Sequence, residues 1–395
     1  MIKFAEALVI GEGRAALAVV RSLGRQGIPV TVAGYSSKTL AGSSRYAAKR
    51  IVIPHPFLDP DGMARALREE AQKNPGRVWI PVTDETLAVV DGLRDSLSGI
   101  RLPFPPSSVL ELAWDKAKLA EFATVCGLHV PRTLRPRHAR EAVEQAVSLG
   151  FPVILKPARS KLRTKNGFRE GAVRIIKDQK DLISAWNREN DNIPFPLLQE
   201  NIPGHGEGVF ILADRGRVVA RFAHRRLREK PPSGGVSVLR ESVPVPQILI
   251  EPVDRLIQAL GWHGACMIEF RIDARDGKPY LMEINPRFWG SLQLAVDSGV
   301  DFPFLLYRLA LGENPESVLD YQMGIRSRWL LGDLDHLIIR LKRHSGHSDL
   351  SSKRVGKLHA VLKFLNPFAG KQEVFRWNDM KPAWVELMKY FGGPK

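Results

Sequence analysis

Residues 266–293 read CMIEFRIDARDGKPYLMEINPRFWGSLQ, and this stretch decides the fold that the sequence predicts. Two apolar runs rich in β-forming residues, 267–272 and 279–284, flank the turn signal Ala-Arg-Asp-Gly. A three-residue loop with its glycine in the left-handed conformation closes such a hairpin. The resulting register places Glu269 directly opposite Glu283.

The second strand of this hairpin carries polar residues at alternate positions, namely Glu283, Asn285 and Arg287. Strand side chains alternate between faces, so these three project on one side, together with Glu269. Facing carboxylates destabilise a sheet, and the arrangement therefore needs a compensating cation. All-oxygen ligands suit a hard cation such as Mg²⁺ or Mn²⁺. The alternative is a solvated hairpin face, because Glu-x-Asn by itself is a common pair.

The segment IEFRID, which contains Glu269, and the later segment MEINPRFWGS resemble the metal-binding end of the ATP-grasp superfamily. In that family, two acidic residues and an asparagine hold Mg²⁺ ions that bridge the ATP phosphates, and the arginine contacts the transferred phosphoryl group. The resemblance implies ATP and Mg²⁺ or Mn²⁺ as cofactors. It also implies Glu269, Glu283 and Asn285 as metal ligands and Arg287 as a catalytic residue. It covers about residues 1–313.

Two lysines are candidates for contact with the ATP phosphates. Lys118 belongs to the predicted helix 115–126, which is similar to the helix that enters the ATP-grasp domain. The alternative for Lys118 is a solvated surface charge. Lys156 ends the predicted strand FPVILKP, where burying an unpaired lysine would cost several kcal/mol. The resemblance assigns both lysines to phosphate binding.

The segment around the predicted strand 196–201 is assigned to the nucleoside by the same resemblance. Backbone groups of Glu200, Asn201 and Ile202 would bind the adenine edge, since peptide N–H and C=O groups match its donors and acceptors. Glu207 would accept hydrogen bonds from the ribose hydroxyls. A plain surface position is the alternative for Glu207.

Two basic stretches have open roles. Residues 158–171 hold five Lys or Arg and two glycines where the family commonly has a glycine-rich phosphate flap. This segment is either a basic clamp or an exposed charged hairpin.

Residues 222–241 predict a mobile basic loop between two strands, and Arg226 in it is expected to contact substrate as a catalytic residue. The alternative for this loop is a nucleic-acid-binding or merely solvated surface.

The N-terminal sequence predicts a βαβ unit, with strand 7–10, the fingerprint Gly-Glu-Gly-Arg-Ala-Ala, a helix and strand 30–33. Alone, the fingerprint suggests a dinucleotide or S-adenosylmethionine site, but the acidic residue expected next is missing from Gly-Tyr-Ser at 34–36. The alternative is a glycine turn for strand–helix packing. In ATP-grasp proteins such a loop faces the acceptor substrate. Further strands and helices, including a helix at 86–97, continue a parallel α/β sheet.

The composition restricts the class of protein. The chain has 58 Lys or Arg against 42 Asp or Glu, a net charge of +16 that favours polyanionic partners. Two cysteines, Cys126 and Cys266, leave no disulfide framework and no Cys-rich metal site. No apolar run approaches about 18 residues and no signal peptide is recognised, so the expected location is the cytoplasm.

Residues 321–395 are a basic extension with 14 Lys or Arg and six Asp or Glu, a net charge of +8. The amphipathic stretch 330–343 predicts a helix that either packs on the body or lies on an anionic membrane surface. Trp329, Trp377 and Trp384 favour packing, which is the expectation here.

The predicted architecture is an α/β fold with three parts. An N-terminal βαβ domain spans 1–106, an ATP-grasp domain spans 107–320 and the basic, mainly helical extension spans 321–395. Within the ATP-grasp domain, a lid of about 127–195 precedes a body of about 196–320.

The expected activity, implied by the resemblance, is ATP-dependent phosphorylation of a carboxylate followed by attack of an amine. A carboxylase, a kinase and a non-catalytic nucleotide- or membrane-binding module are the alternatives. The expected partners are small-molecule carboxylates and amines, without nucleic acid. Contact of the extension with an anionic membrane is a further option, and the oligomeric state is open.

Overall fold

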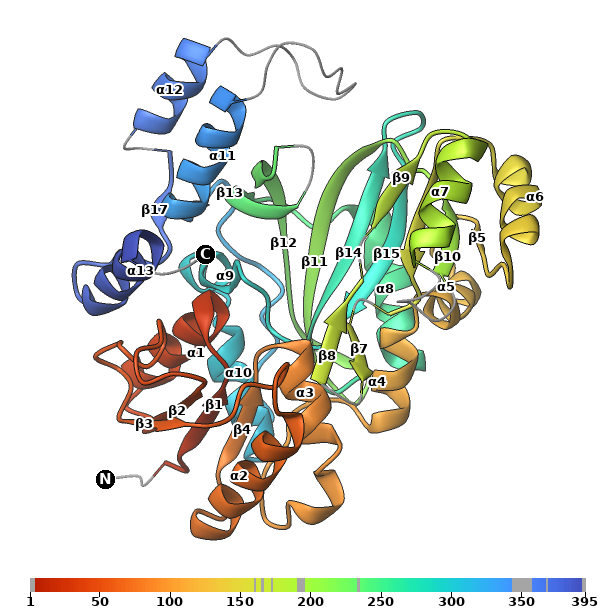
Figure 1. Ribbon diagram of the computed structural model, residues 1–395. Coiled ribbons are helices and arrows are strands. Elements are labelled where there is room, and N and C mark those ends of the chain that lie inside the picture. The colour runs from red at the N-terminus through yellow and green to blue at the C-terminus, as the bar shows by residue number, and fades with distance from the viewer. Residues whose placement is uncertain are drawn as a thin grey trace.

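The computed structural model describes residues 4–159, 161–164, 167–171, 173–189, 196–232, 235–342, 357–366 and 369–392. Its N-terminal layer is a parallel sheet in the order β3-β2-β1-β4, accompanied by helices α1 to α3 (Figure 1). The elements are β1 (Ala7–Ile10), α1 (Gly13–Arg25), β2 (Val30–Gly34), β3 (Lys49–Val52), α2 (Pro60–Lys73), β4 (Val78–Pro81) and α3 (Asp84–Asp91). The predicted parallel α/β unit is confirmed. The predicted helix 86–97 is wrong in extent, because α3 ends before Gly92 and a short 3₁₀ turn follows.

Gly11 shows what the N-terminal glycine turn contributes to packing. Its φ of +127° favours glycine, and a Cβ added there would lie 2.8 Å from Cγ2 of Val82, which follows β4. Glycine therefore lets the turn between β1 and α1 lie directly against the neighbouring strand connection. This geometry supports the packing role considered for the turn.

A second sheet, which is antiparallel, has the order β5-β10-β6-β9. Helices α6 and α7 pack on it through a small core that includes Ala142, Trp186 and Leu198. Between β6 and β9 the chain forms the hairpin β7–β8, whose Lys161 pairs with Glu85 of α3. The elements are α4 (Ser107–Trp114), α5 (Lys116–Val125), β5 (Thr133–Leu134), α6 (Ala139–Leu149), β6 (Val153–Pro157), β7 (Lys161–Thr164), β8 (Gly167–Glu170), β9 (Arg174–Ile176), α7 (Gln179–Glu189) and β10 (Pro196–Glu200).

The largest sheet has the order β15-β14-β11-β12-β13-β16-β17 and contains the predicted metal-binding hairpin. Successive residues of β11 face two different cores. Val209 and Ile211 pack with α5 and α8, whereas Phe210 and Leu212 pack with α1, α9 and α10. The elements are β11 (Gly204–Asp214), β12 (Arg217–Lys230), β13 (Val236–Ser242), α8 (Gln247–Ala259), β14 (Gly264–Asp273), β15 (Pro279–Asn285), α9 (Leu292–Asp297) and α10 (Phe302–Ala310).

In the described part of the basic stretch 222–241, most residues belong to strands and not to the mobile loop that the charges and glycines predict. Strand β12 continues to Lys230, and β13 begins at Val236, so Arg226 lies on a strand paired with Arg240. Ion pairs with Glu229 and Glu269 compensate the charge of Arg226. The alternation of polar and apolar residues did not predict this strand, because its charged residues pair with residues of distant elements that the local sequence does not reveal.

The C-terminal segment contributes to the large sheet as well as forming helices. Strand β16 (Arg326–Arg328) pairs with β13, and β17 (Lys371–Gln372) extends the same sheet. Helices α11 (Leu330–Lys342), α12 (Lys357–Leu365) and α13 (Lys381–Gly392) lie at the end of the molecule opposite the sheet β5-β10-β6-β9 (Figure 1). None of the helices in the described ranges combines the length and the apolar character that crossing a bilayer requires.

Packing of the C-terminal segment depends on one of the three tryptophans named for it. Trp329 contacts the main core, its indole N–H donates to Glu386 at 2.8 Å, and the guanidinium of Arg14 lies 3.9 Å from its ring centroid. Trp377 and Trp384 are 85% and 61% exposed, so the expectation that they pack on the body is wrong.

Candidate active site

The hairpin β14–β15 places Glu269 opposite Glu283 as predicted, but the predicted three-residue loop is wrong, because Ile272 pairs with Pro279 and the register next to the turn is shifted by one residue. Glu269 pairs with Glu283 across the two strands, and a bulge follows directly after Glu269. Gly277 closes the turn with a φ of +72°, and its N–H donates to the carbonyl of Asp273 at 2.8 Å. The bulge offsets the shift at the turn, so the turn and the bulge together place the two carboxylates opposite each other.

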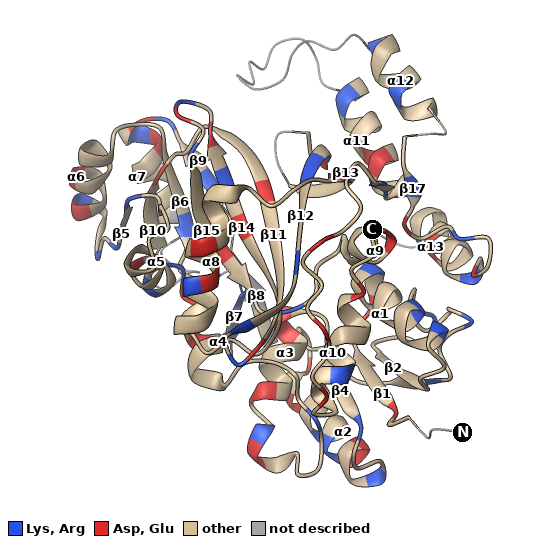
Figure 2. Cartoon of the chain, turned by 180° about the vertical axis from the view of Figure 1, so that it is seen from behind, with Lys and Arg blue, Asp and Glu red and all other residues tan. Residues whose placement is uncertain are grey.

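Cations from other elements compensate the facing carboxylates. The Lys116 ammonium at the start of α5 lies 3.2 Å from Oε2 of Glu283, and the Arg226 guanidinium of β12 lies 3.0 Å from Oε2 of Glu269. The amide N–H₂ of Asn285 donates to Oε1 of Glu283 at 3.0 Å. Acidic and basic positions accordingly lie close together on this part of the sheet (Figure 2).

The two carboxyl groups differ in their acidity. Burial alone would favour protonation of Glu283, but the charge of Lys116 and the hydrogen bond from Asn285 hold its pKa at about 2. Burial raises the pKa of Glu269 above its ordinary value, against the lowering effect of Arg226 and with the help of the Glu283 charge. Glu283 is therefore the carboxylate that stays ionised most firmly at neutral pH.

Lys156 lies where the sequence placed it, at the end of β6. Its side chain is buried, and its ammonium donates to Oε1 of Gln199 on the paired strand β10 at 2.7 Å. Burial, followed by repulsion from Lys116, lowers the pKa of Lys156 to about 7, while Glu283 and Glu269 oppose the shift. Lys156 is thus within electrostatic reach of the carboxylates.

The structure places Lys116, and not Lys118, beside the carboxylates. Asp115 caps α5 and accepts the backbone N–H groups of Ala117 and Lys118, so that Lys116 opens the helix on the side facing β15. Lys118 is exposed. It follows Lys116 by two residues, which is more than half a helical turn, so its side chain projects from the other side of α5. The sequence signal that could have identified Lys116 is its position directly after the capping aspartate.

Arg287 is held by a residue that sequence reasoning missed. Its Nε and Nη2 donate to Oδ2 of Asp84, the first residue of α3, at 2.9 and 2.8 Å. Its Nη2 also donates to Oδ1 of Asn285 at 3.1 Å. The Asp84 charge raises the pKa of Arg287 despite the opposing effect of burial. Nothing in the local sequence marks Asp84, since the contact spans about two hundred residues.

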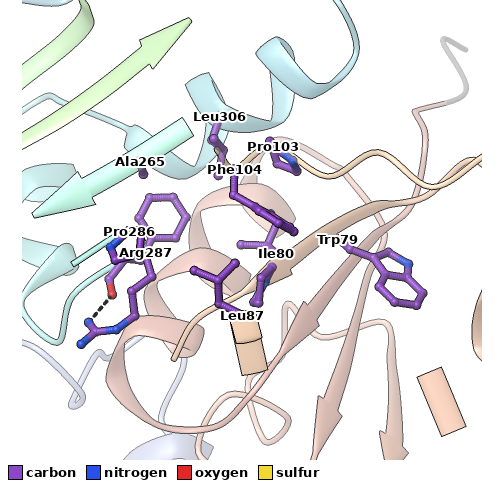
Figure 3. Close-up of a pocket in the computed structure, with 11 residues that line it drawn as sticks. Trp79, Ile80, Leu87, Pro103, Phe104, Ala265, Pro286, Arg287 and Leu306 are labelled. Carbon is purple, nitrogen blue, oxygen red and sulfur yellow. Dashed lines mark hydrogen bonds between the residues drawn. The ribbon is translucent and has the colours of Figure 1, made fainter. Parts of the chain in front are cut away.

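Figure 3 shows where the Arg287 segment meets the N-terminal layer. Arg287 lies at one side of a narrow crevice whose other walls come from β4, α3 and Phe104. The walls are otherwise apolar and include Ile80 and Leu87. This contact fixes the Arg287 loop against the N-terminal layer, so both parts of the chain complete the site.

The residues predicted to bind the nucleoside lie around the turn between β10 and β11. The carbonyl of Ile202 accepts from Arg271, and the carboxylate of Glu200 lies 3.3 Å from a guanidinium nitrogen of Arg275. Glu207 lies on β11, 3.2 Å from a ring nitrogen of His205. The structure keeps Glu200, Asn201 and Ile202 adjacent, and their role in binding adenine stays a prediction.

A family model described as ATP-grasp in the biosynthetic pathway with Ter operon matches residues 192–332. The chain is 24% identical over 338 residues to the carbamoyl phosphate synthase large chain of Methanothermobacter thermautotrophicus, covering 78% of this chain and 31% of that protein. The arginine-specific large chain of Halalkalibacterium halodurans is 26% identical over 284 residues, covering 65% of this chain and 26% of that protein. This chain thus spans less than a third of the length of these relatives.

Solved structures give the same fold. The biotin carboxylase domain of Hydrogenobacter thermophilus 2-oxoglutarate carboxylase has a TM-score of 0.65 at 19% identity, over 81% of this chain and 73% of that one. An L-amino acid ligase from Bacillus licheniformis has a TM-score of 0.60 at 19% identity, over 78% and 75%. The N5-carboxyaminoimidazole synthetase of Staphylococcus aureus has a TM-score of 0.62 at 16% identity, over 82% of each chain. The chain therefore has the ATP-grasp fold, and its residues 192–332 match an ATP-grasp family model.

Proposed function

We propose that this protein is an ATP-dependent ligase that phosphorylates a substrate carboxylate and joins the resulting acyl phosphate to an amine. The observation that carries the proposal is the convergence of two carboxylates, one amide and four cations around the hairpin β14–β15, the cations being Lys116, Lys156, Arg226 and Arg287. Phosphoryl transfer demands positioning and charge neutralisation more than covalent catalysis by the protein, and this cluster offers both.

The donor set fits a magnesium or manganese ion. Glu283 and Glu269 supply carboxylate oxygens opposite each other, and Asn285 supplies an amide oxygen two residues from Glu283. Within the described ranges no three His, Cys, Asp or Glu side chains group as a metal site. A cation held by two carboxylates and an amide, with phosphate and water as its other ligands, agrees with this. Such an ion, when bound, would neutralise phosphate charge.

The side chains around the carboxylates have distinct proposed roles. Lys116 and Lys156 would bind the phosphates of ATP, and Arg287, fixed by Asp84, would contact the group in transfer. Arg226 would hold the substrate carboxylate, because its guanidinium already lies 3.0 Å from Glu269, one of the proposed metal ligands. None of these groups acts as a nucleophile.

The proposed reaction has two steps. A carboxylate oxygen attacks the terminal phosphorus of ATP, the bond from that phosphorus to the bridging oxygen breaks, and ADP leaves. The amine then attacks the acyl carbon, phosphate leaves, and the nitrogen loses a proton. Both steps need a site in which developing negative charge meets fixed cations.

A carboxylase is the second candidate function. The names of two similar structures, the biotin carboxylase domain and the N5-carboxyaminoimidazole synthetase, indicate carboxylating enzymes, whereas the L-amino acid ligase indicates amide formation. In a carboxylase, bicarbonate would replace the organic carboxylate as phosphoryl acceptor. The same cations would serve either acceptor.

The test is ATP-dependent phosphate release in the presence of Mg²⁺ with pools of carboxylates and amines, and separately with bicarbonate. The ligase proposal expects release that requires a carboxylate and an amine together. Release with bicarbonate and an amine alone would instead establish the carboxylase. Release that none of these acceptors stimulates would contradict both proposals.

A further inference from the structure

The described acidic residues of the C-terminal segment all make contacts inside the protein. Within the described part of 321–395, each acidic side chain has a partner. The pairs are Asp333 with Arg228 and Arg328, Asp335 with Lys230, Glu373 with Arg14 and Arg240, Asp379 with Arg21, and Glu386 with Trp329. The carboxylates therefore fasten the segment to the N-terminal layer and the large sheet.

The described lysines of the same segment lie on the outside. Five of them are exposed on or next to α12, β17 and α13. Of these five, only Lys389 also approaches a carboxylate in the described part of the chain, that of Glu12 at 3.6 Å. They are Lys357, Lys363, Lys371, Lys381 and Lys389. The fold thus separates the charges of this segment, with acids inward and lysines outward.

Large apolar side chains are exposed among these lysines. On α12 they are Leu358, Leu362 and Leu365, and on α13 they are Trp384, Met388 and Phe391. Both sets have the spacing i, i+4, i+7, which forms a stripe along one side of a helix. We call the two stripes with the five lysines the outer C-terminal surface.

The stripes are too exposed to serve the packing of this chain. Trp384 is 61% exposed and Phe391 72%, while Ala360 and Pro382 face inward on the same two helices. Apolar residues gathered on an outer surface mark an interaction site more often than scattered ones do. Exposed aromatic and aliphatic side chains flanked by lysines are the pattern of helices that lie in a membrane interface.

We propose that the outer C-terminal surface binds peripherally to the headgroup region of an anionic lipid bilayer. The lysines would lie near lipid phosphates while the leucines, tryptophan and phenylalanine enter the boundary with the acyl chains. The proposal is independent of the catalytic function. Helices α12 and α13 lie on the far side of the molecule from the hairpin β14–β15, so a bound protein would keep the candidate active site open (Figure 1).

Charge distinguishes a lipid surface from a second copy of this chain as the occupant. Two copies meeting through this surface would bring their lysines together, and like charges across an interface oppose association. An anionic bilayer offers the opposite charge over its whole area. The net charge of +16 favours the same partner at long range.

The test is co-sedimentation of the full-length protein with vesicles of phosphatidylcholine alone and of phosphatidylcholine mixed with phosphatidylglycerol. Binding is expected only to the mixed vesicles and is expected to weaken as salt rises, because the Debye length is only about 10 Å at 0.1 M. Replacing Lys357, Lys363 and Lys381 by Gln should lower the partition coefficient about fivefold for each charge removed. The double variant Trp384→Ser/Phe391→Ser should lose binding to the mixed vesicles.

Leu58→Ser is the matched control, because Leu58 is 79% exposed and lies outside the outer C-terminal surface. This variant should bind the mixed vesicles as the unchanged protein does. Unaltered binding of the Trp384→Ser/Phe391→Ser variant, with its fold verified by circular dichroism, would overturn the proposal. So would a concentration-dependent dimer that this variant abolishes in sedimentation velocity, since a second copy would then cover the surface.

Discussion

At the scale of single residues, the site depends on buried cations whose charges repel one another. Lys156 and Lys116 serve the same carboxylates, and with burial this repulsion lowers the pKa of Lys156 to about 7. An unfolded lysine has a pKa of about 10.4, so between these values the folded protein binds fewer protons than the unfolded chain. Charging Lys156 therefore destabilises the free protein below about pH 7, and the penalty disappears as pH rises towards 10.

ATP binding is expected to take up a proton at Lys156. At about pH 8 most Lys156 side chains are neutral in the free protein, because the pKa is about 7. Phosphate oxygens nearby favour the ammonium form, and the pKa rises on binding. Calorimetric titration with ATP in buffers of different ionisation enthalpy measures this uptake. Lys156→Met should remove it, and equal uptake by the variant would show that another group is protonated.

Lys116→Met and Lys118→Met are a matched pair of variants on the same helix. Lys116 lies 3.2 Å from Glu283, whereas Lys118 is exposed. Loss of a charge-assisted contact costs about 1.5–3 kcal/mol, so ATP affinity should fall at least tenfold in Lys116→Met and little in Lys118→Met. Equilibrium binding of ATP with Mg²⁺ measures both. A larger loss in Lys118→Met would restore Lys118 as the phosphate ligand.

Glu283→Gln should abolish the Mg²⁺-dependent part of ATP binding and lower turnover below about a tenth, a loss above ~1.4 kcal/mol. The reason is that Glu283 is the carboxylate most firmly ionised, with a pKa of about 2. Asp276→Asn on the exposed turn of the same hairpin is the control. Titrations of ATP with and without Mg²⁺ measure this effect. If ATP binding by Glu283→Gln depended on Mg²⁺ as fully as in the unchanged protein, Glu283 would not be a metal ligand.

At the scale of elements, the site is assembled from two helix starts, one strand end and the interior of three strands. It combines the start of α3, the start of α5, the end of β6, the middle of β12 and the hairpin β14–β15. The start of α3 matters most for Arg287, which it holds from another layer of the molecule.

Asp84→Asn should free Arg287 and lower the free energy of unfolding by about 1–3 kcal/mol, since Arg287 would keep a partly buried charge with less compensation. Urea unfolding of Asp84→Asn, Arg287→Met and the double variant gives the coupling energy between them. A coupling above about 0.5 kcal/mol is expected for residues in contact. Additive losses would mean that the ion pair does not position Arg287.

At the scale of the whole molecule, the C-terminal segment is fastened by a buried ion pair. Arg21 of α1 lies 2.8 Å from Asp379, and its other nitrogens donate to the carbonyls of Glu373 and Val374. Asp379 also accepts from Ser44 at 2.7 Å. These contacts hold α1, near the N-terminus, against the C-terminal segment beside the large sheet.

Asp379→Asn should destabilise the protein by about 3–5 kcal/mol, because it leaves the buried charge of Arg21 without its counterion. Chemical unfolding measures the loss, and limited proteolysis should cut the C-terminal segment earlier than in the unchanged protein. Asp320→Asn, at an exposed position, should stay within about 0.5 kcal/mol. An equally small effect of Asp379→Asn would show that the segment docks through its apolar contacts alone.

The sequence by itself determined the local features of this protein. The β-hairpin, the parallel N-terminal unit and the strand with Lys156 near its end follow from turn chemistry and residue periodicity, whereas the opposition of Glu269 and Glu283 also needs a bulge that the sequence did not predict. The first three depend on interactions between residues close in sequence or in one register, so the pattern of residue types is sufficient to predict them.

Only the tertiary structure decided which distant groups meet these features. It selected Lys116 over Lys118, brought Asp84 to Arg287, made a strand of the basic stretch around Arg226 and left Trp384 exposed. Each outcome depends on which surface packs against which. Ion pairs between residues hundreds of positions apart, and the burial of single side chains, arise from that packing. A charged residue looks the same in the sequence whether it contacts water or a carboxylate from another layer.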